Sequence, residues 1–559
     1  RRQHCDRPAS QLGGSTTTTV REATFDLLRQ LGLTTIFGNP GSTEETFLRN
    51  YPDDFRFILG LHEASVVAAA DGYAQATRSA VVVNVHTAAG VSNAMGALMT
   101  AAQNRTPLIL TAGQQTRDML LLEPWLVNAE PDVLVKPWVK WSYQPVRPQD
   151  IPAAFMRAYA VALQPPAGPV FLSLPLDDWD APSTVPLAVR TVATRVAPDP
   201  ARLAEFAGWI AEAKRPVLVY GSDIARGAGW GPAITLAEKL GVPVWFAPAS
   251  ERPPFPENHP LYAGGLPFAQ GLISEKLAGH DVVVVIGAPV FRYYPWVPGP
   301  YIPEGCRLLH ITCDPDESGR APVGDSLLSD AVLALEALAG LLPARTTPAS
   351  VVTQAHRMAP HPAAESDVDE SADGTPLTAR QLFRILRAAA PRDTVLVEES
   401  PSNLADLHAE WPITEPDSFW TFASGALGWD LPAAVGIALA ERDSGRNRPV
   451  LAVIGDGSLQ YSIQALYTAA QHKLALTVVV PSNGEYAILK AFANFENCPG
   501  VPGLDIPGLK PSLLAAGYGA TGVVASTAKE VHGALRDAWE RDGPTLIEVP
   551  IDSSIPSLA

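Results

Sequence analysis

Short, continuous apolar runs alternate with alanine-rich stretches along almost the whole chain, and this alternation constrains the fold more than any other feature. Between runs such as 55–59 and 81–85, alanine-rich stretches such as 62–78 have the spacing of helices. A strand that is apolar at every position is buried on both faces, as in a parallel sheet covered by helices. The pattern therefore predicts an α/β fold built from doubly wound parallel sheets.

The alternation falls into three blocks. A capping box at Thr19 and Glu22 predicts the first helix. Predicted strands lie at 34–37, 55–59, 81–85, 108–111 and 170–174, then at 217–220, 242–246, 282–286 and 308–311, and finally at 394–397, 450–454, 476–480 and 546–549. We predict a disordered leader (1–18), an N-terminal domain (19–190), a central domain (191–342), an exposed linker rich in Pro and small polar residues (343–375) and a C-terminal domain (376–559).

Composition excludes several classes of function. Lys plus Arg total 41 and Asp plus Glu total 58, a net charge of −17, which disfavours nucleic acid and anionic membranes as partners. No apolar run approaches the 18 residues of a membrane span. The four cysteines are too few and too scattered for a disulfide framework or a zinc ribbon, so we expect a cytoplasmic protein.

Neither of the glycine clusters that follow predicted strands, Gly38–Ser42 and Gly455–Ser458, has the GxGxxG spacing that a nicotinamide-dependent dehydrogenase needs for its phosphate loop. The sequence also has no Walker A lysine and no GxSxG elbow. The central block likewise has no glycine-rich phosphate loop, and we expect it to be structural rather than a site for a nucleotide such as FAD.

Gly455-Asp456-Gly457-Ser458 follows directly on the predicted strand 450–454, and a helical stretch is predicted at 461–471. A strand end that leads into a helix is where open α/β sheets bind phosphates. An aspartate there would repel a phosphate unless a cation lay between them. Asn483-Gly484-Glu485 follows the next strand 27 residues later, so Asp456, Asn483 and a main-chain carbonyl could form an oxygen ligand set for Mg²⁺.

Each motif also has a purely structural interpretation. Gly455–Ser458 could be a tight strand-to-helix turn, and Asn-Gly could be a type I′ hairpin. Either motif alone would favour that interpretation. Their spacing on consecutive predicted strands favours the metal and phosphate site.

The combination of GDG and a later Asn resembles the signature of thiamin diphosphate-dependent enzymes. Glu63, in Leu61-His62-Glu63-Ala64, supplies the acid that the family requires in its first domain. Further similar stretches are 38–42 (GNPGS), 86–96 (HTAAGVSNAMG), 111–117 (TAGQQTR), 139–143 (VKWSY), 285–293 (VIGAPVFRY), 312–315 (TCDP) and 501–505 (VPGLD). These stretches identify the 2-oxoacid decarboxylases as the family that the chain resembles, with the benzoylformate decarboxylases as the most similar branch. The resemblance extends from about residue 19 to residue 550.

The resemblance implies roles for individual residues. Glu63 would bond the cofactor's aminopyrimidine N1′, and Ser42 and His86 would face the substrate carboxylate and the reacting carbon. The resemblance further implies cofactor contacts from Gly425, Leu427, Ser402, Gly457, Ser458 and Tyr486, metal ligation by Asp456, Asn483 and the carbonyl of Glu485, and a substrate pocket that includes Phe492 and Leu126. Taken singly, Glu63 could be a first-turn helix acid and His86 a structural histidine.

Four residues depart from the family pattern around the expected pocket. They are Tyr294 in place of a second histidine, Ile488 in place of a small residue, Trp125 in place of an aliphatic one and Thr421 in place of an aromatic one. Aryl specificity is therefore less firmly implied than decarboxylation.

The implied reaction is decarboxylation of benzoylformate to benzaldehyde and CO₂ through an enamine of thiamin diphosphate, with Mg²⁺ (or Ca²⁺). Its partners would be a small 2-oxoacid and further copies of the chain, as a homodimer that pairs into a homotetramer. The alternatives are a decarboxylase of another 2-oxoacid, a carboligase of the same family, or a catalytically silent scaffold. Retention of Glu63, Asp456 and Asn483 argues against the scaffold.

Overall fold

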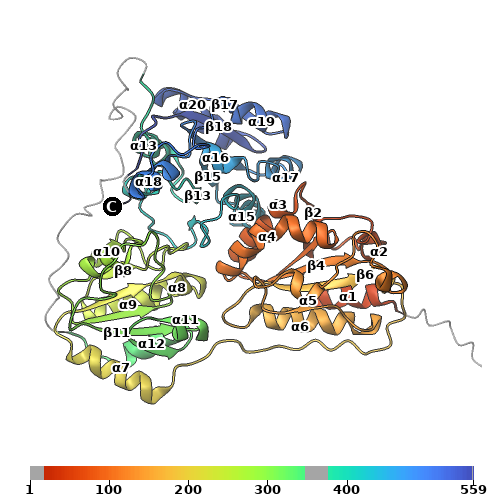
Figure 1. Ribbon diagram of the computed structural model, residues 1–559, viewed down its shortest axis with the longest axis horizontal. Coiled ribbons are helices and arrows are strands. Elements are labelled where there is room, and N and C mark those ends of the chain that lie inside the picture. The colour runs from red at the N-terminus through yellow and green to blue at the C-terminus, as the bar shows by residue number, and fades with distance from the viewer. Residues whose placement is uncertain (1–17, 346–374, 557, 559) are drawn as a thin grey trace, which may run out of the picture.

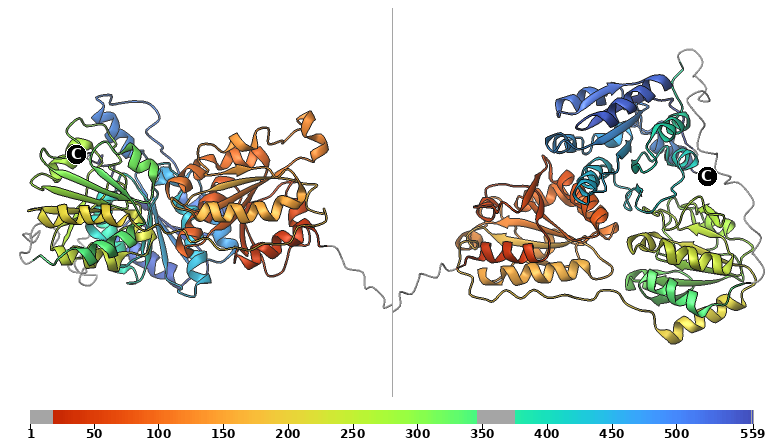
Figure 2. Two further views of the ribbon diagram at one scale, coloured as in Figure 1. Left: turned by 90° about the horizontal axis from the view of Figure 1, so that it is seen from below. Right: turned by 180° about the vertical axis from the view of Figure 1, so that it is seen from behind.

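The computed structural model describes residues 18–345, 375–556 and 558, which form three lobes at the corners of a triangle (Figure 1). The predicted leader lies almost wholly, and the predicted linker largely, outside the described residues. The segment between the first two lobes runs as an extended chain along one side of the molecule (Figure 2). No helix of the described part of the chain combines the length and apolar character needed to cross a bilayer.

The N-terminal domain is a six-stranded parallel sheet in the order β2-β1-β3-β4-β6-β5. Its strands are β1 (Thr35–Asn39), β2 (Arg56–Leu59), β3 (Val81–Val85), β4 (Leu108–Gln114), β5 (Ser142–Tyr143) and β6 (Val170–Pro175). Its helices are α1 (Val20–Gln30), α2 (Glu45–Leu48), α3 (Glu63–Thr77), α4 (Thr87–Gln103), α5 (Pro131–Leu134) and α6 (Ile151–Leu163), with 3₁₀ turns at Arg117–Leu122 and Pro148–Asp150. The predicted capping box of Thr19 and Glu22 is present and begins α1.

The central domain has a different strand order, β12-β11-β10-β7-β8-β9, which is that of a nucleotide-binding doubly wound sheet. Its strands are β7 (Pro216–Tyr220), β8 (Val244–Phe246), β9 (Tyr262–Gly265), β10 (Val282–Ile286), β11 (Arg307–Thr312) and β12 (Asp325–Leu328). Its helices are α7 (Pro200–Glu212), α8 (Ser222–Arg226), α9 (Trp230–Leu240), α10 (Gln270–Lys276), α11 (Pro315–Arg320) and α12 (Ala331–Leu341).

The C-terminal domain repeats the order of the first one, as β14-β13-β15-β16-β18-β17. Its strands are β13 (Val395–Glu399), β14 (Phe419–Trp420), β15 (Val450–Ile454), β16 (Leu476–Ser482), β17 (Thr521–Val524) and β18 (Thr545–Pro550). Its helices are α13 (Ala379–Ala389), α14 (Leu404–Glu410), α15 (Asp430–Asp443), α16 (Asp456–Leu459), α17 (Ala465–Gln471), α18 (Ala487–Phe495), α19 (Pro511–Gly517) and α20 (Ala528–Glu540). The three parallel sheets confirm the predicted fold class.

One predicted helix start is wrong. The stretch 461–471 is helical only from Ala465, and residues 460–464 form a turn. The amide of Tyr461 bonds to the carbonyl of Ser458, three residues back, and Ser462 repeats this spacing with Leu459. This tighter winding separates α16 from α17, and Tyr461 packs on Gly428, where a Cβ would lie 2.7 Å from the Cβ of Tyr461.

Two helices join the N- and C-terminal domains. A Cβ on Gly72 of α3 would collide with the Ala433 carbonyl of α15, and a Cβ on Gly436 would collide with the Ala69 carbonyl of α3. The two backbones therefore touch, and one buried cluster runs through both domains. Because Glu63 begins α3 and α15 starts three residues after Leu427, this contact fixes two predicted site segments relative to each other.

Candidate active site

Ser42, Glu63 and His86 lie at the carboxyl edge of the N-terminal sheet, because each follows one of the strands β1, β2 and β3. Ser42 is exposed beside an open cavity of about 470 Å³ that the turn after β1 lines. Glu63 is buried at the first position of α3, and His86 is the residue before α4. The structure thus gathers the three predicted catalytic side chains on one edge of one sheet.

Glu63 is held by two side-chain amides. Its Oε1 accepts a hydrogen bond of 3.1 Å from Asn39 and its Oε2 one of 3.0 Å from Asn93. A Cβ on Gly90 would lie 3.3 Å from Oε1, so that glycine lets α4 approach the carboxylate closely. Glu63 is therefore a fixed, buried hydrogen-bond acceptor rather than a solvated helix-terminus acid.

His86 has a partner that the sequence did not indicate. Its Nδ1 lies 2.8 Å from Oε2 of Glu44 and 3.2 Å from the hydroxyl of Thr43. Glu44 follows the GNPGS stretch by two residues, but its contacts come from segments up to 69 residues away. No local pattern in the sequence could have revealed it.

Asp456 and Asn483 meet at the carboxyl edge of the C-terminal sheet, because β15 and β16 are neighbouring parallel strands. Oδ2 of Asp456 accepts from the amide of Gly484 (2.8 Å) and Oδ1 from the amide of Gly457 (2.8 Å). Burial raises the pKa of Asp456, while these backbone amides oppose the shift. Oδ1 of Asn483 accepts from the amide of Glu485 at 3.1 Å.

The GDG segment is packed too tightly for a larger residue. A Cβ on Gly457 would collide with the Tyr486 ring and lie 3.2 Å from Ile506. Ser458 is buried in the first turn of α16. The hydroxyl of Ser402 accepts from the amide of Ile488 at 3.0 Å, which brings these two predicted residues together at the start of α18.

Gly425 and Leu427 lie on the loop that leads into α15. Gly425 has φ +73°, a conformation that favours glycine, and nothing occupies the space of its missing Cβ. Glu399, at the end of β13, anchors the loop by accepting from the amides of Gly428, Trp429 and Asp430 at 2.6–2.8 Å. Burial raises the pKa of Glu399 to about 8, although these three donors favour its charged form. Sequence reasoning missed Glu399.

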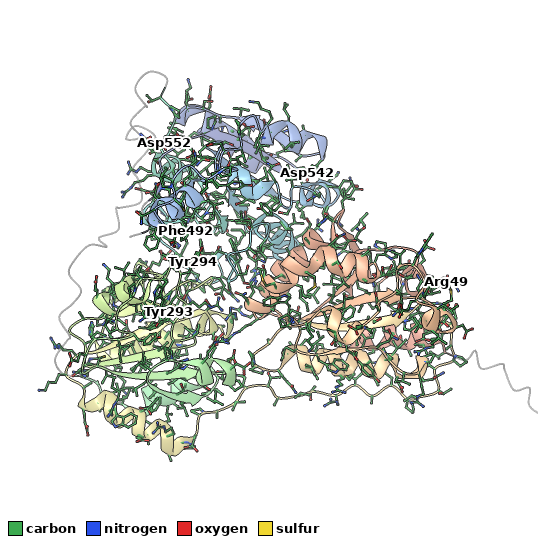
Figure 3. The ribbon with its side chains drawn as sticks, viewed as in Figure 1. Arg49, Tyr293, Tyr294, Phe492, Asp542 and Asp552 are labelled. Carbon is green, nitrogen blue, oxygen red and sulfur yellow. The ribbon has the colours of Figure 1, made fainter. Side chains whose placement is uncertain are left out.

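The predicted pocket residues come from all three domains. Tyr294 of the central domain packs on Phe492 of α18, with ring centroids 4.9 Å apart (Figure 3). Trp125 and Leu126 project from the N-terminal domain, 93% and 46% exposed. The hydroxyl of Thr421 donates to the buried Glu398 at 3.1 Å, so this threonine satisfies a neighbouring carboxylate.

Within the described chain, no hydrogen bond or ion pair joins Ser42, Glu63 or His86 to the predicted cofactor and metal residues of the C-terminal domain. Among these described residues there is also no group of three or more His, Cys, Asp or Glu side chains suited to a metal. A cation at Asp456 would therefore depend on amide and main-chain oxygens as well.

The carboxyl edge of the central sheet is filled by Arg105, from the end of α4. Its guanidinium pairs with Asp223 at 2.5 Å, Asp314 at 3.3 Å and Glu317. Arg226 pairs with the same Asp223 at 2.6 Å. These side chains lie at the edge of the sheet where this strand order places a nucleotide in other proteins.

Comparison with known proteins assigns the three lobes to one class of enzyme. The N-terminal domain of thiamine pyrophosphate enzymes matches residues 18–130, their central domain residues 203–338 and their C-terminal domain residues 403–549. The chain belongs to the thiamine pyrophosphate (thiamin diphosphate)-dependent enzyme family.

Its relatives within the family include benzoylformate decarboxylases. The chain is 44% identical to benzoylformate decarboxylase of Pseudomonas aeruginosa, over 96% of this chain and all of that protein. Its sequence is 51% identical to that of benzoylformate decarboxylase from Polynucleobacter necessarius. The crystal structure of that protein matches with a TM-score of 0.91, over 96% of this chain and 99% of that one. A 4-hydroxybenzoylformate decarboxylase of Rhodococcus jostii RHA1 is 40% identical, with a TM-score of 0.89 over 96% and 99% of the two chains.

Proposed function

We propose that the chain is a thiamin diphosphate-dependent decarboxylase of aromatic 2-oxoacids, with benzoylformate as the leading substrate and benzaldehyde and CO₂ as products. The observation that carries the proposal is the identity of 44–51% to benzoylformate decarboxylases over nearly the full length. The presence of Glu63, Asp456 and Asn483 at two sheet edges supports it.

The residues present fit the cofactor and its metal. Asp456 and Asn483 offer carboxylate and amide oxygens on adjoining loops, which are the ligands that Mg²⁺ prefers in proteins. With the carbonyl of Glu485, they would hold Mg²⁺ (or Ca²⁺). Contacts to the diphosphate are proposed for Ser402, Gly457, Ser458 and Tyr486. Gly425 and Leu427 would support the cofactor from the loop before α15.

Thiamin diphosphate, when bound, supplies a carbon nucleophile and an electron sink for the carboxylate's bonding pair. Glu63 would accept a hydrogen bond from the aminopyrimidine ring, since its carboxylate is buried and already oriented by Asn39 and Asn93. His86 would move a proton at the reacting carbon, and Ser42 would hold the substrate carboxylate. Phe492, Tyr294, Ile488, Leu126, Trp125 and Thr421 are proposed to shape the pocket.

We also propose that each complete site needs two copies of the chain, in a homodimer that pairs into a tetramer. The exposure of the apolar side chains of Trp125 and Leu126 supports this. Sedimentation that finds an active monomer would contradict it. The free Cys306, Cys313 and Cys498 support a reducing cytoplasm.

A substrate panel tests the proposal. Protein supplied with thiamin diphosphate and Mg²⁺ should release CO₂ and aldehyde from benzoylformate faster than from pyruvate or from branched and long-chain 2-oxoacids. Inclusion of acceptor aldehydes would reveal carboligation as 2-hydroxyketone. A preference for an aliphatic 2-oxoacid by more than tenfold in kcat/KM would contradict the aromatic assignment.

A further inference from the structure

Glu44 is a buried carboxylate, 1% exposed, to which no role has been assigned so far. Its Oε1 accepts from the amide of Gly113 at 2.6 Å and from the hydroxyl of Thr43 at 2.9 Å. Its Oε2 accepts from the amide of Gly41 at 2.9 Å and lies 2.8 Å from Nδ1 of His86. Four donors around one buried acid satisfy both oxygens and fix the carboxylate in a single orientation.

Two glycines make this arrangement possible. A Cβ on Gly113 would collide with Oε1 of Glu44, and a Cβ on Gly41 would collide with the ring of His86. The main chain at the ends of β1 and β4 therefore approaches both the acid and the imidazole more closely than any other residue would allow. The ring and the carboxylate are enclosed together.

This contact decides which ring nitrogen of His86 carries a proton. An ionised carboxylate only accepts hydrogen bonds, so the contact requires the proton on Nδ1. The Thr43 hydroxyl donates to Oε1 of Glu44, which leaves its lone pairs facing Nδ1. In the described part of the chain no protein group is bonded to Nε2, and the side chain is 20% exposed.

We infer that Glu44 is a positioning residue, which holds His86 with Nδ1 protonated and presents Nε2 to the substrate. The inference rests on the proposed function, in which His86 moves a proton at the reacting carbon. With Glu44 in place, Nε2 is the nitrogen that gives or takes that proton. Glu44 itself stays behind the ring and out of contact with substrate.

A purely structural role is the competing explanation, because the amide of Glu44 also bonds to the Gly41 carbonyl and closes the turn after β1. The two explanations separate in a double-mutant cycle of Glu44→Gln and His86→Ala. If Glu44 acts through His86, Glu44→Gln should lower kcat by about 10- to 100-fold in the wild-type background. In the His86→Ala background, Glu44→Gln should lower kcat by less than about threefold.

Glu22→Gln is the matched control, because it removes the side-chain carboxylate of the α1 capping box in the same domain. It should leave kcat unchanged. Affinity for thiamin diphosphate with Mg²⁺, measured by titration calorimetry, should be the same for Glu44→Gln and wild type. Equal losses in both backgrounds, or a loss of cofactor affinity that matches the loss of kcat, would overturn the positioning role. Should Glu44→Gln fail to fold, Glu44→Asp, which keeps the charge but shortens the reach, enters the same cycle.

A second readout needs no activity. ¹⁵N NMR of histidine-labelled apo-protein, with His86→Ala to assign the signal, should find neutral His86 protonated on Nδ1, and a proton on Nε2 would overturn the inference. If the wild-type enzyme decarboxylates no aromatic 2-oxoacid, the proposed function fails, while the NMR result still decides whether Glu44 fixes the ring.

Discussion

The N- and C-terminal domains share one strand order, yet the carboxyl edges of their sheets carry different groups. At the N-terminal edge, Glu63 is held by two side-chain amides, those of Asn39 and Asn93. At the C-terminal edge, Asp456 is held by two main-chain amides, those of Gly457 and Gly484. Under the proposed function, the side chains at the first edge would handle protons, and the acid at the second edge would hold a metal-bridged phosphate. One strand order would then serve two tasks.

Of the substitutions considered, removal of the Asp456 carboxylate should have the largest effect, and the property that changes is cofactor binding. Asp456→Ala should weaken thiamin diphosphate binding in Mg²⁺ by more than about 10²-fold, since a metal that bridges two negative groups is worth several kcal/mol. Titration calorimetry measures the loss, with the exposed Asp537→Ala as the control. Tight binding by Asp456→Ala in EDTA would show that the anchor lies elsewhere.

Gly457, which is closely packed, tests whether cofactor binding depends on the exact shape of the loop at the C-terminal edge. In Gly457→Ala the new Cβ meets the Tyr486 ring, and overpacking of this kind costs about 1–3 kcal/mol. Cofactor affinity should fall by roughly tenfold or more. Gly208→Ala, in α7, where nothing lies within 4 Å of the new Cβ, should bind normally. Normal cofactor binding by Gly457→Ala would mean that the loop can shift to accommodate the new Cβ without disturbing the site.

Asp430 offers a test by pH. Both its carboxylate oxygens are buried without a hydrogen-bond partner, and burial, together with the charges of Glu399 and Glu398, raises its pKa well above the ordinary value. The folded state therefore binds the proton more tightly than the unfolded state. This contribution to stability is lost as pH rises from about 4 through the folded pKa.

Asp430→Asn should accordingly stabilise the C-terminal domain at alkaline pH, by about 1–3 kcal/mol, and flatten the fall in thermal midpoint between pH 5 and 9. Calorimetric scans across that range measure it. Asp443→Asn, which removes a partner of Arg56, should instead destabilise the fold. If the thermal midpoint of Asp430→Asn fell with pH as it does in the wild type, another titrating group would be responsible for that fall.

The smallest effect is expected at Tyr294, which is 67% exposed and rests on Phe492. Its contact is made by the ring, so Tyr294→Phe should change kcat less than about threefold and Tyr294→His should be tolerated. A loss in Tyr294→Phe of about 10²-fold at constant KM would instead give the hydroxyl a part in proton transfer.

The interior strands were predictable from sequence, and most edge strands were not. Runs such as Val81–Val85 and Val450–Ile454 match the structure because a strand buried on both faces is apolar throughout. The missed strands are β5, β9, β12, β14 and β17, which all lie at sheet edges. All are short, and most are only partly buried, so no continuous apolar run marks them.

The same distinction holds for the candidate site. The meeting of Asp456 and Asn483 at one sheet edge was predictable because each comes within two residues of the end of an interior strand. The contacts of Glu44 and Glu399 were not predictable, because hydrogen-bond partners lie up to 69 residues away for Glu44 and about 30 residues away for Glu399. Buried acids of this kind are defined by tertiary contacts, which leave no local pattern.

Glu63→Gln tests the division of labour between the two edges most directly. Glutamine keeps the size of Glu63 but cannot act as a carboxylate toward the aminopyrimidine ring. Titration calorimetry should find cofactor affinity within about threefold of wild type, because the proposed diphosphate and metal contacts lie in the other domain. Exchange of the cofactor's C2 proton with solvent deuterium, followed by NMR on acid-quenched samples, should slow by about 10²-fold or more. Near-normal exchange in Glu63→Gln would contradict the account.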